Sequence, residues 1–279
     1  MNIQVKASFK KEFLAFFRTK MFIIITLVTL GLSIISPLLI TGLGALMTFM
    51  SDLYADFGID ITMLTEELGS TSSIGVVSSV SDITGAGLIV MLILMIKIAG
   101  GEQKKRSVII PKSSGLTSRA YIFPKFIIYP LFAFILAVIG MFLSWFFSAL
   151  LFETNDVSFL GVLLAGILTG VSLVFYVCFH LTLGTATGQP GMSAAVCITM
   201  SMLLPNIFAF TVSDYMYNPF ALSMLASSLV HFNVISRVEL LDILITVLFA
   251  LALIVGAYFI AIFAQNARKI DNTGNEIEL

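Results

Sequence analysis

The sequence predicts an all-α membrane protein with six transmembrane helices, and three observations lead to this fold class. Hydrophobic residues make up 58% of the chain and charged residues only 11%, whereas soluble globular domains contain roughly 25% charged residues. Uncharged apolar runs long enough to cross a bilayer recur along the whole chain. Lys and Arg gather in a few short segments, as in the cytoplasmic loops of membrane proteins. A soluble domain with one buried core is therefore excluded.

Segment 5–20 is predicted to be an amphipathic helix that lies in the membrane interface before the first span. Helical spacing places four aromatic residues on one face of this helix: Phe9, Phe13, Phe16 and Phe17. Basic residues, among them Lys10 and Lys11, occupy its flanks and back, from which long side chains reach the lipid headgroups. A plain helical extension of the first span is the alternative interpretation.

Six apolar segments follow, and together with the interfacial helix they form one transmembrane domain that covers residues 1–279. The spans are predicted at 21–43, 84–99, 126–151, 159–183, 192–212 and 238–265, and a polar cytoplasmic tail follows at 266–279. In the fourth span, Gly166 and Gly170 form a G-x-x-x-G pattern that lets another helix approach closely. Cys178 and Cys197 fall inside apolar runs, so they are expected to be small buried residues rather than a disulfide.

Two connections on the outer side have distinctive compositions. Residues 52–83 carry acidic but no basic side chains, and are interpreted as a short amphipathic helix on the outer surface followed by a Ser/Gly-rich link. The aspartates of this helix are interpreted as a solvated face, with attraction of cations as the alternative. Residues 213–242 are too apolar for a solvated loop of this length, so one or two short re-entrant helices, shielded by protein, are expected there.

The charge-dense loop from Lys97 to Lys125 determines the orientation of the spans. Its basic residues are Lys97, Lys104, Lys105, Arg106, Lys112, Arg119 and Lys125. Because basic loops resist translocation, this loop is predicted to be cytoplasmic, with both termini on the same side. All but Arg237 of the 15 Lys and Arg then lie inside, and most of the 16 Asp and Glu lie outside. The predicted location is the cytoplasmic membrane of a bacterium, as a multi-pass protein.

The predicted spans contain almost no groups that could perform chemistry. In the interiors of the predicted spans, His180 is the one residue that could take up and release a proton or an ion. It is interpreted as a satisfied interfacial histidine rather than a proton relay, which disfavours proton-driven transport. No metal-binding motif, hydrolase motif or P-loop occurs in the sequence. The chain is therefore predicted not to be an enzyme, and any work against a gradient needs energy from another polypeptide. The basic helix and the basic loop are either surfaces on which such a partner pushes or contacts with anionic lipid.

The layout of the chain and several short motifs resemble the permease subunits of ABC-2 type (type-2 exporter) ABC transporters. The segment KKEFLAFFRTK, Lys10–Lys20, resembles the interfacial helix of that family, and Asn218–Phe220 resembles its NPF-like segment before the last span. The other matching positions lie in or next to the basic loop: Glu102, Ser113, Ser114, Ser118, Arg119 and Lys125. Arg106 and Ser107 replace the Gly-Thr pair of the family, and Gly115 stands where proline is common.

The resemblance implies a permease that pairs with a second copy or a related permease and with two cytoplasmic ATP-binding subunits. ATP and Mg would be bound by those subunits, and no cofactor by this chain. Closure of the ATP-binding subunits would be transmitted through the interfacial helix and the basic loop. The residues expected to couple the permease to them are Glu102, Lys104, Lys105, Arg106, Ser113, Ser114 and Arg119.

The substrate-binding residues stay unassigned at this level. Uncharged, aromatic-rich spans suit an amphipathic or hydrophobic substrate such as a peptide, a drug or a lipid. The expected partners are thus the ATP-binding subunits, a second permease and membrane lipid, and no nucleic acid. Two other functions are open: a non-transporting scaffold or sensor that recruits a partner through the basic loop, and a channel that needs no energy source.

Overall fold

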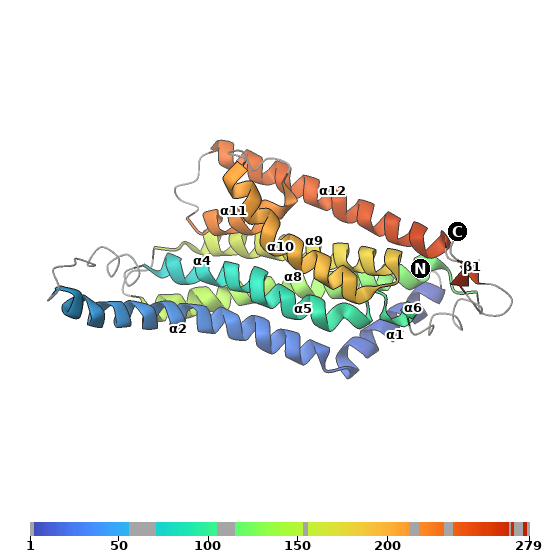
Figure 1. Cartoon of the computed structure of the whole chain (residues 1–279), viewed down its shortest axis with the longest axis horizontal. Helices are drawn as coiled ribbons and strands as arrows, with labels where there is room; N and C mark the ends of the chain where they lie inside the picture. The colour runs from blue at the N-terminus through green and yellow to red at the C-terminus, as the bar shows by residue number, and fades with distance from the viewer. Residues whose placement is uncertain are drawn as a thin grey trace.

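The fold is a bundle of long helices that follow the long direction of the molecule (Figure 1). The computed structural model describes residues 3–55, 71–104, 115–152, 156–211, 218–231, 237–267, 269–270 and 276–277. Apart from short turns, these residues are helical, and the exception is one antiparallel pair of two-residue strands, β1 (Lys269–Ile270) and β2 (Glu276–Ile277).

Among the described residues, six helical segments are long and apolar enough to cross a membrane, which confirms the prediction of a six-span membrane protein. The first is α2 (Met21–Ala55), and the second is built from α4 (Ser72–Asp82), the π-helical turn η1 (Ile83–Gly87), α5 (Leu88–Leu94) and η2 (Met95–Lys97). The others are α8 (Ser118–Leu151), α9 (Phe159–Thr187), α10 (Pro190–Thr211) and α12 (Arg237–Ala267). Shorter helices lie beside them: α1 (Ile3–Arg18), α6 (Gly101–Lys104), η3 (Pro219–Ala221) and α11 (Leu222–Leu229).

α1 is a separate helix, because the chain turns sharply between α1 and α2 (Figure 1). Thr19 and Lys20 are not helical, and Lys20 has a φ of 56°, in the left-handed region that few residues with a side chain adopt. A plain extension of α2 is thereby excluded. α1 begins and α12 ends at the same end of the bundle (Figure 1). This end is called the terminal end below, and the sequence predicts that it faces the cytoplasm.

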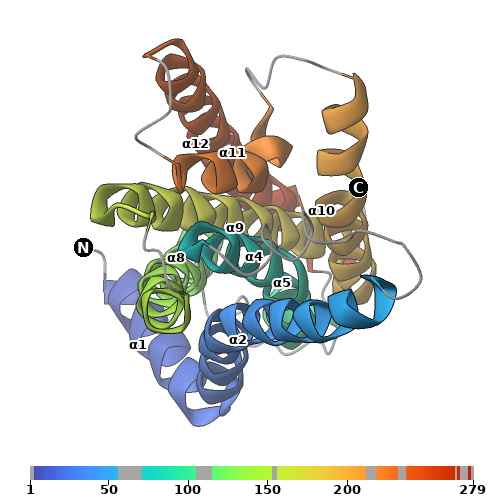
Figure 2. The same cartoon turned by 90° about the vertical axis from the view of Figure 1, so that its left-hand side faces the viewer.

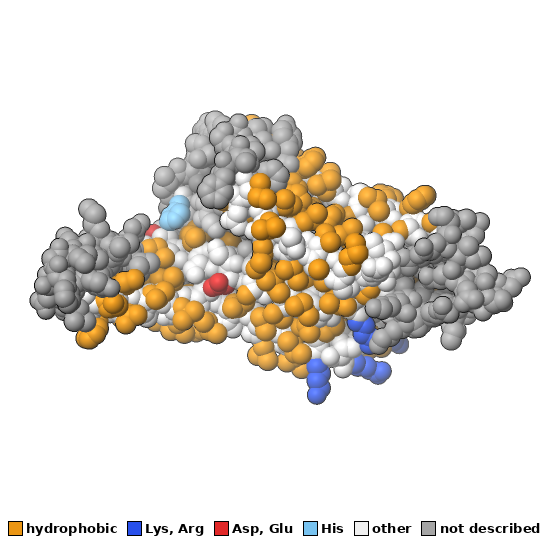
Figure 3. Space-filling view, viewed as in Figure 1, with side chains coloured by type: hydrophobic (Ala, Val, Ile, Leu, Met, Phe, Trp, Pro, Cys, Tyr) orange, Lys and Arg blue, Asp and Glu red, His pale blue; other side chains and the backbone are white. Residues whose placement is uncertain are grey.

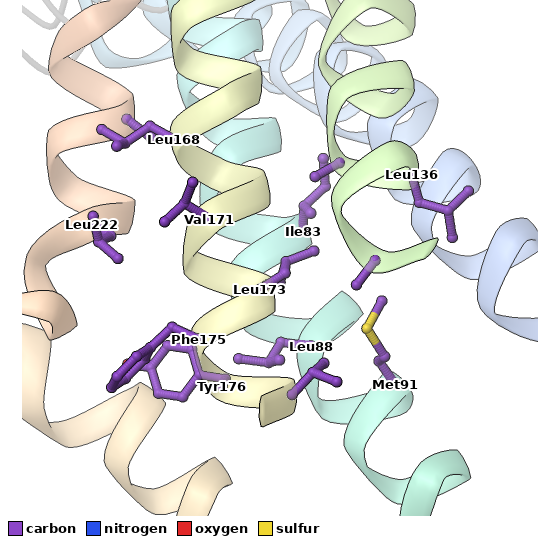
Figure 4. Close-up of a cluster of buried hydrophobic side chains, with 14 of the residues drawn as sticks. Ile83, Leu88, Met91, Leu136, Leu168, Val171, Leu173, Phe175, Tyr176 and Leu222 are labelled. Carbon is purple, nitrogen blue, oxygen red and sulfur yellow. The ribbon is translucent and has the colours of Figure 1, made fainter. Parts of the chain in front are cut away.

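α9 is the central helix of the bundle. It packs against α8, α10, α11 and α12 (Figure 2). In its most apolar stretch of 18 residues, 72% of the residues are buried, compared with 22% in that of α10 and 17% in that of α12. Leu173, Phe175 and Tyr176 of α9 pack in the apolar core with Leu88 of α5 and Leu222 of α11 (Figure 4). α10 and α12 therefore leave most of their surface to lipid or to other chains.

The second span begins at Ser72, so the predicted Ser/Gly-rich link before residue 84 is wrong in its last part. Two hydroxyl groups of this segment bond within the helix: Ser79 Oγ donates to the carbonyl oxygen of Gly75 at 3.1 Å, and Thr84 Oγ1 donates to that of Val80 at 2.7 Å. Hydroxyls satisfied in this way are compatible with a helix inside the membrane. The predicted outer surface helix falls mostly on residues 56–70, which lie outside the described residues.

The third span begins at Ser118 rather than at residue 126. Thr117 caps α8, because its Oγ1 accepts a hydrogen bond from the backbone nitrogen of Ala120 at 3.3 Å. Arg119 and Lys125 therefore lie on the first turns of a long helix and not in a loop. The charge-rich segment between the second and third spans is shorter than the sequence predicts.

α9 continues past the predicted end at residue 183 and stops where Gly188 adopts a φ of 67°. Within this extra turn, Gly184 lies directly against the turn that follows the second span. A Cβ atom on Gly184 would overlap the carbonyl oxygen of Ala99, and one on Gly100, which has a φ of 146°, would overlap the carbonyl oxygen of Gly184. Two glycines thus allow α9 to touch the backbone that leads into α6.

η3 and α11 pack along α9, between the fifth and sixth spans. Asn218 starts this segment, because its Oδ1 accepts a hydrogen bond from the backbone nitrogen of Phe220 at 3.1 Å. The ring of Phe220 packs on Phe175 and Tyr176, with centroid distances of 5.5 and 6.4 Å. At the other end, the backbone of Val230 lies against Gly161 of α9. Whether this segment re-enters the membrane stays a prediction.

Candidate functional site

A network of charged side chains, most of them buried or partly buried, joins α1, α6 and α8 at the terminal end. At its centre, Lys125 of α8 is only 3% exposed, and its Nζ lies 2.6 Å from Oε2 of Glu102 on α6. The same Nζ donates to the hydroxyl of Tyr121 at 2.9 Å and to the carbonyl oxygen of Ile98 at 3.3 Å. All three donors of the ammonium group are therefore used, which is what a buried lysine needs to remain charged.

Glu102 receives hydrogen bonds from three side chains. Besides Lys125, Tyr121 donates its hydroxyl to Oε2 at 2.8 Å and Lys11 of α1 donates to Oε1 at 3.3 Å. Burial alone raises the pKa of Glu102, but the positive charges of Lys125 and Lys11 and these hydrogen bonds outweigh burial and lower the pKa to about 2. The carboxylate is therefore ionised at any physiological pH.

A second carboxylate ties α1 to the middle of the network. Glu12 is 5% exposed, and its Oε2 accepts a hydrogen bond from the hydroxyl of Tyr129 on α8 at 3.2 Å. Its Oε1 lies 3.6 Å from Nζ of Lys11. Two acidic and two basic side chains thus balance each other in this network, and α1 is held to α8 by polar bonds as well as by packing.

Aromatic packing supports the same position of α1. Phe16 is 3% exposed and packs edge-on against Tyr129 and Phe132 of α8, with centroid distances of 5.4 and 4.8 Å. Nearer the start of α1, Gln4 Nε2 donates to the carbonyl oxygen of Gly115 at 3.1 Å. α1 and α8 therefore run side by side in the same direction. A force on α1 or α6 would reach α8 directly.

The structure brings only some of the predicted coupling residues into this network. Glu102 lies inside it, Arg119 is exposed on the first turn of α8, and Lys104 ends α6. The remaining predicted residues lie outside the described part of the chain: Lys105, Arg106, Ser113 and Ser114. The carboxylate of Glu102 bonds to the chain itself, which differs from the expected direct contact across a subunit interface.

On the interfacial helix, Phe16 is buried and Phe9 is partly buried against the core, whereas Phe13 and Phe17 are 46% and 45% exposed. Lys10 and Lys11 are exposed, and Lys11 reaches Glu102. The other predicted contact, the glycine pair of α9, faces α8. A Cβ atom on Gly166 would lie 3.3 Å from the Cβ of Met141, and one on Gly170 would lie 2.6 Å from the ring of Phe134.

Sequence reasoning missed three members of the network: Glu12, Tyr121 and Tyr129. A usable signal was present, because Tyr121, Lys125 and Tyr129 recur at intervals of four and so form a polar stripe on one face of a helix. Lys125 was instead counted as the last residue of a basic loop. A lysine flanked by tyrosines one turn away on each side is a pattern that predicts a buried, hydrogen-bonded ammonium group.

A groove lined by polar side chains lies deeper in the bundle, between the second span, α9, α10 and α11. It has a volume of about 470 Å³ and is called the hydroxyl groove below. Its lining residues are Ser81, Thr84, Gly85, Tyr176, Ser201, Met202, Pro205, Asn206, Ser223, Met224 and Ser227. Thr84, Ser201, Asn206 and Ser227 each donate a hydrogen bond to a carbonyl oxygen of their own helix. Their side-chain oxygen atoms can still accept hydrogen bonds, so the groove suits water, a polar ligand or another chain better than lipid.

Two features of the hydroxyl groove are typical of a functional site. Tyr176 is 3% exposed, and its hydroxyl has no hydrogen-bond partner among the described residues. The second span is π-helical from Ile83 to Gly87, beside the groove, and such turns are frequent at functional sites. A ligand that accepts or donates a hydrogen bond at Tyr176 would satisfy the buried hydroxyl.

Asp82 corrects the expectation that His180 alone is ionisable within the spans. It lies in the second span, where its Oδ2 accepts a hydrogen bond from Ser36 Oγ of α2 at 2.6 Å. Lys125 is likewise part of the third span. His180 itself is fully buried, and its Nδ1 lies 2.8 Å from Ser193 Oγ. The sequence prediction left Asp82 and Lys125 outside the spans because it began the second span at residue 84 and the third at residue 126. The two spans begin at Ser72 and Ser118.

The fold and these two sites define a multi-pass, all-helical membrane protein with a charge network at one end and a polar groove between its spans. No protein-family model, curated protein or solved structure matches the chain significantly.

Proposed function

We propose that the chain is the membrane-spanning permease subunit of an ATP-driven exporter, similar to the ABC-2 type permeases. The terminal end then faces the cytoplasm of a bacterium, two ATP-binding subunits bind there, and a second permease copy or homologue completes the transporter. ATP and Mg belong to the ATP-binding subunits, so this chain transports and does not hydrolyse.

The observation that supports this proposal best is the Lys125–Glu102 pair and the network around it. A partner that pushes on α1 or α6 moves α8 with them, because the three elements share buried, charge-assisted hydrogen bonds. Packed helices that shift as rigid bodies are a known way to open and close a path. Glu102 is therefore proposed to transmit the movement inside the permease, while exposed groups such as Arg119 contact the ATP-binding subunit.

The hydroxyl groove supports transport of a neutral, amphipathic substrate. Its polar groups are hydroxyls and one amide, interspersed with Met202, Met224 and Pro205. Such a lining offers hydrogen bonds without fixed charge, and methionine adapts to varied shapes. A peptide, drug or lipid with uncharged hydrogen-bonding groups fits these properties.

The test is purification of the tagged chain from its native membrane, followed by identification of the co-purifying soluble subunits and an ATPase assay. The proposal expects a P-loop ATPase in an equal number of copies, and ATPase activity that the substrate stimulates. Glu102→Gln should keep the ATPase bound but reduce the stimulation by at least tenfold. Asp156→Asn, which removes a carboxylate at the opposite end, is the matched control and should keep it.

Recovery of the chain alone, or with a partner that binds no nucleotide, would favour the scaffold, sensor or channel. A second candidate function is ion-coupled transport, which Asp82 favours because a carboxylate inside a span can bind and release a cation. Asp82→Asn separates the two mechanisms: it abolishes transport by an ion-coupled carrier, whereas an ATP-driven exporter keeps most of its activity.

A further inference from the structure

A second groove, lined only by apolar residues, runs between α1 and α8 at the terminal end. It is called the phenylalanine groove here and has a volume of about 180 Å³. Its lining residues are Phe9, Phe13, Phe16, Phe17, Ile127, Ile128, Leu131, Phe132 and Ile135. Phe13, Phe17 and Leu131 are each about half exposed, so an apolar ligand can reach the groove from the membrane.

Two lysines continue the exposed side of this groove toward the start of α1. Lys6, Lys10, Phe13 and Phe17 follow one another at intervals of four, three and four residues, which places them on one stripe of the helix. Lys6 and Lys10 are both exposed. Neither forms an ion pair with any residue that the structure describes. In the view of Figure 3, Lys and Arg side chains lie around α1 and its junction with α2, next to a hydrophobic surface.

The direction of the groove matches the polarity of a phospholipid. α1 and α8 both run from the terminal end into the bundle, with Gln4 beside Gly115 and Phe16 beside Phe132. Lys6 and Lys10 therefore lie at the end nearer the membrane surface, and the apolar lining extends inward. From Ile127 to Ile135 the groove follows α8 for about 12 Å, at 1.5 Å per residue. One leaflet contributes about 15 Å of hydrocarbon, so the groove runs beside an acyl chain over most of its depth in that leaflet.

We propose that this groove binds one anionic phospholipid of the leaflet at the terminal end. Its acyl chain packs along the phenylalanine groove, and Lys6 and Lys10 hold its phosphate. The charge of the headgroup selects the lipid. Each lysine binds an anionic headgroup more strongly than a zwitterionic one. The bound lipid fills the wedge between α1 and α8 and so supports the position of α1. This inference does not depend on the ATP-driven mechanism.

The test is native mass spectrometry of the purified full chain with equal amounts of phosphatidylglycerol and phosphatidylcholine that carry identical acyl chains. The wild-type protein should retain mainly one phosphatidylglycerol. Lys6→Gln combined with Lys10→Gln should reduce its occupancy roughly tenfold or more, given the usual contribution of each lysine. Leu131→Trp fills the groove and should reduce binding of both lipids.

The matched control is Arg18→Gln combined with Lys20→Gln, which removes two positive charges from the other end of α1. This variant should keep the preference of the wild-type protein. Only variants with the helix content and thermal midpoint of the wild-type protein are compared, so that misfolding is not mistaken for lost binding. The proposal is overturned if phosphatidylcholine binds as well as phosphatidylglycerol, if Lys6→Gln/Lys10→Gln keeps the wild-type occupancy, or if the control variant loses as much.

Discussion

The ammonium nitrogen of Lys125 lies 2.6 Å from a carboxylate oxygen of Glu102, and this ion pair joins α8 to α6. Lys125 is almost completely buried, so the pair is far less screened by water and salt than an ion pair on the surface. A buried pair of this kind adds little net stability over apolar residues, but it becomes very costly when one partner is removed. The pair therefore fixes the arrangement of the two elements more than it stabilises the fold.

Glu102→Gln is expected to destabilise the protein by about 3 kcal/mol, because it leaves the ammonium group of Lys125 buried without its counter-charge. The measurement is the thermal or denaturant midpoint in detergent. Combining Glu102→Gln with Lys125→Met should restore part of the loss, since the double variant has no unpaired charge. Arg119→Gln is the control, because Arg119 is exposed on α8, the helix that carries Lys125. It should change stability by less than about 0.5 kcal/mol. Equal losses for the single and double variants would contradict the pairing.

Glu102 also predicts how stability changes with pH. Its pKa is lowered from 4.5 to about 2 in the folded protein, so the folded state binds the proton less well than the unfolded state. The resulting stabilisation, on the order of 3 kcal/mol, is fully present above pH 4.5 and is lost as the pH falls from 4.5 to 2. Unfolding measured from pH 7 to pH 3 should show this loss only at the acidic end. In Glu102→Gln that part of the acid sensitivity should be missing, and an unchanged profile would argue against the network.

The spans and the interfacial helix were predictable because they depend on local patterns. Hydropathy alone identifies all six spans, and the spacing of Phe9 and Phe16 identifies the face of α1 that packs on α8, whereas Phe13 is about half exposed. The start of the second span was not predictable in the same way. Residues 72–82 are rich in serine and resemble a link, yet Ser79 bonds to a helix carbonyl, Ser72 bonds to Asp156, and the segment packs on α2 and α8.

The charge network was only half predictable, because its members meet through contacts between distant parts of the sequence. Glu102 was singled out by its resemblance to a position in the ABC-2 type permeases, but nothing local shows that Lys11 and Lys125 converge on it. A lysine next to other basic residues is normally solvated, and the tyrosines one helical turn away on each side of Lys125 are the one local signal of its burial. The hydroxyl groove is similar, since its serines come from three separate helices.

Asp156 is expected to stabilise the start of α4 from outside that helix. Its Oδ1 accepts hydrogen bonds from Ser73 N at 3.0 Å and from Ser72 Oγ at 2.9 Å. Burial raises the pKa of Asp156, but the hydrogen bonds from Ser73 and Ser72 outweigh it and lower the pKa. Asp156→Ala should cost about 1 kcal/mol, as for loss of a helix cap. Thr71, at the cap position itself, makes no capping bond to the helix with its side chain, so Thr71→Ala should cost less in the same unfolding assay.

The backbone contact at Gly184 predicts a strong effect of one methyl group. A Cβ atom there would overlap the carbonyl oxygen of Ala99, so Gly184→Ala must push α9 away from the turn that leads to α6. We expect a destabilisation of about 2 kcal/mol or more, typical of overpacking, and weaker protection of α6 from proteolysis. Gly256→Ala on α12 is the matched control, because nothing lies within 4 Å of its position. Similar midpoints for both variants would show that the contact is not tight in the protein.

The hydroxyl groove predicts that water reaches a polar surface inside the membrane region. In a variant with Cys178→Ala and Cys197→Ala, a cysteine at Ser201 or Ser227 should react with a charged, membrane-impermeant maleimide, because Ser201 and Ser227 line the groove. Maleimides react with the thiolate, which forms readily only where water is present. Ser144→Cys is the control: Ser144 is fully buried and bonds to Ser79, so its thiol should stay unreactive. If Ser201→Cys and Ser227→Cys are as unreactive as the control, lipid or another helix fills the groove, and a substrate path along it is ruled out. If they react and an excess of transported substrate slows the reaction, the groove is part of that path.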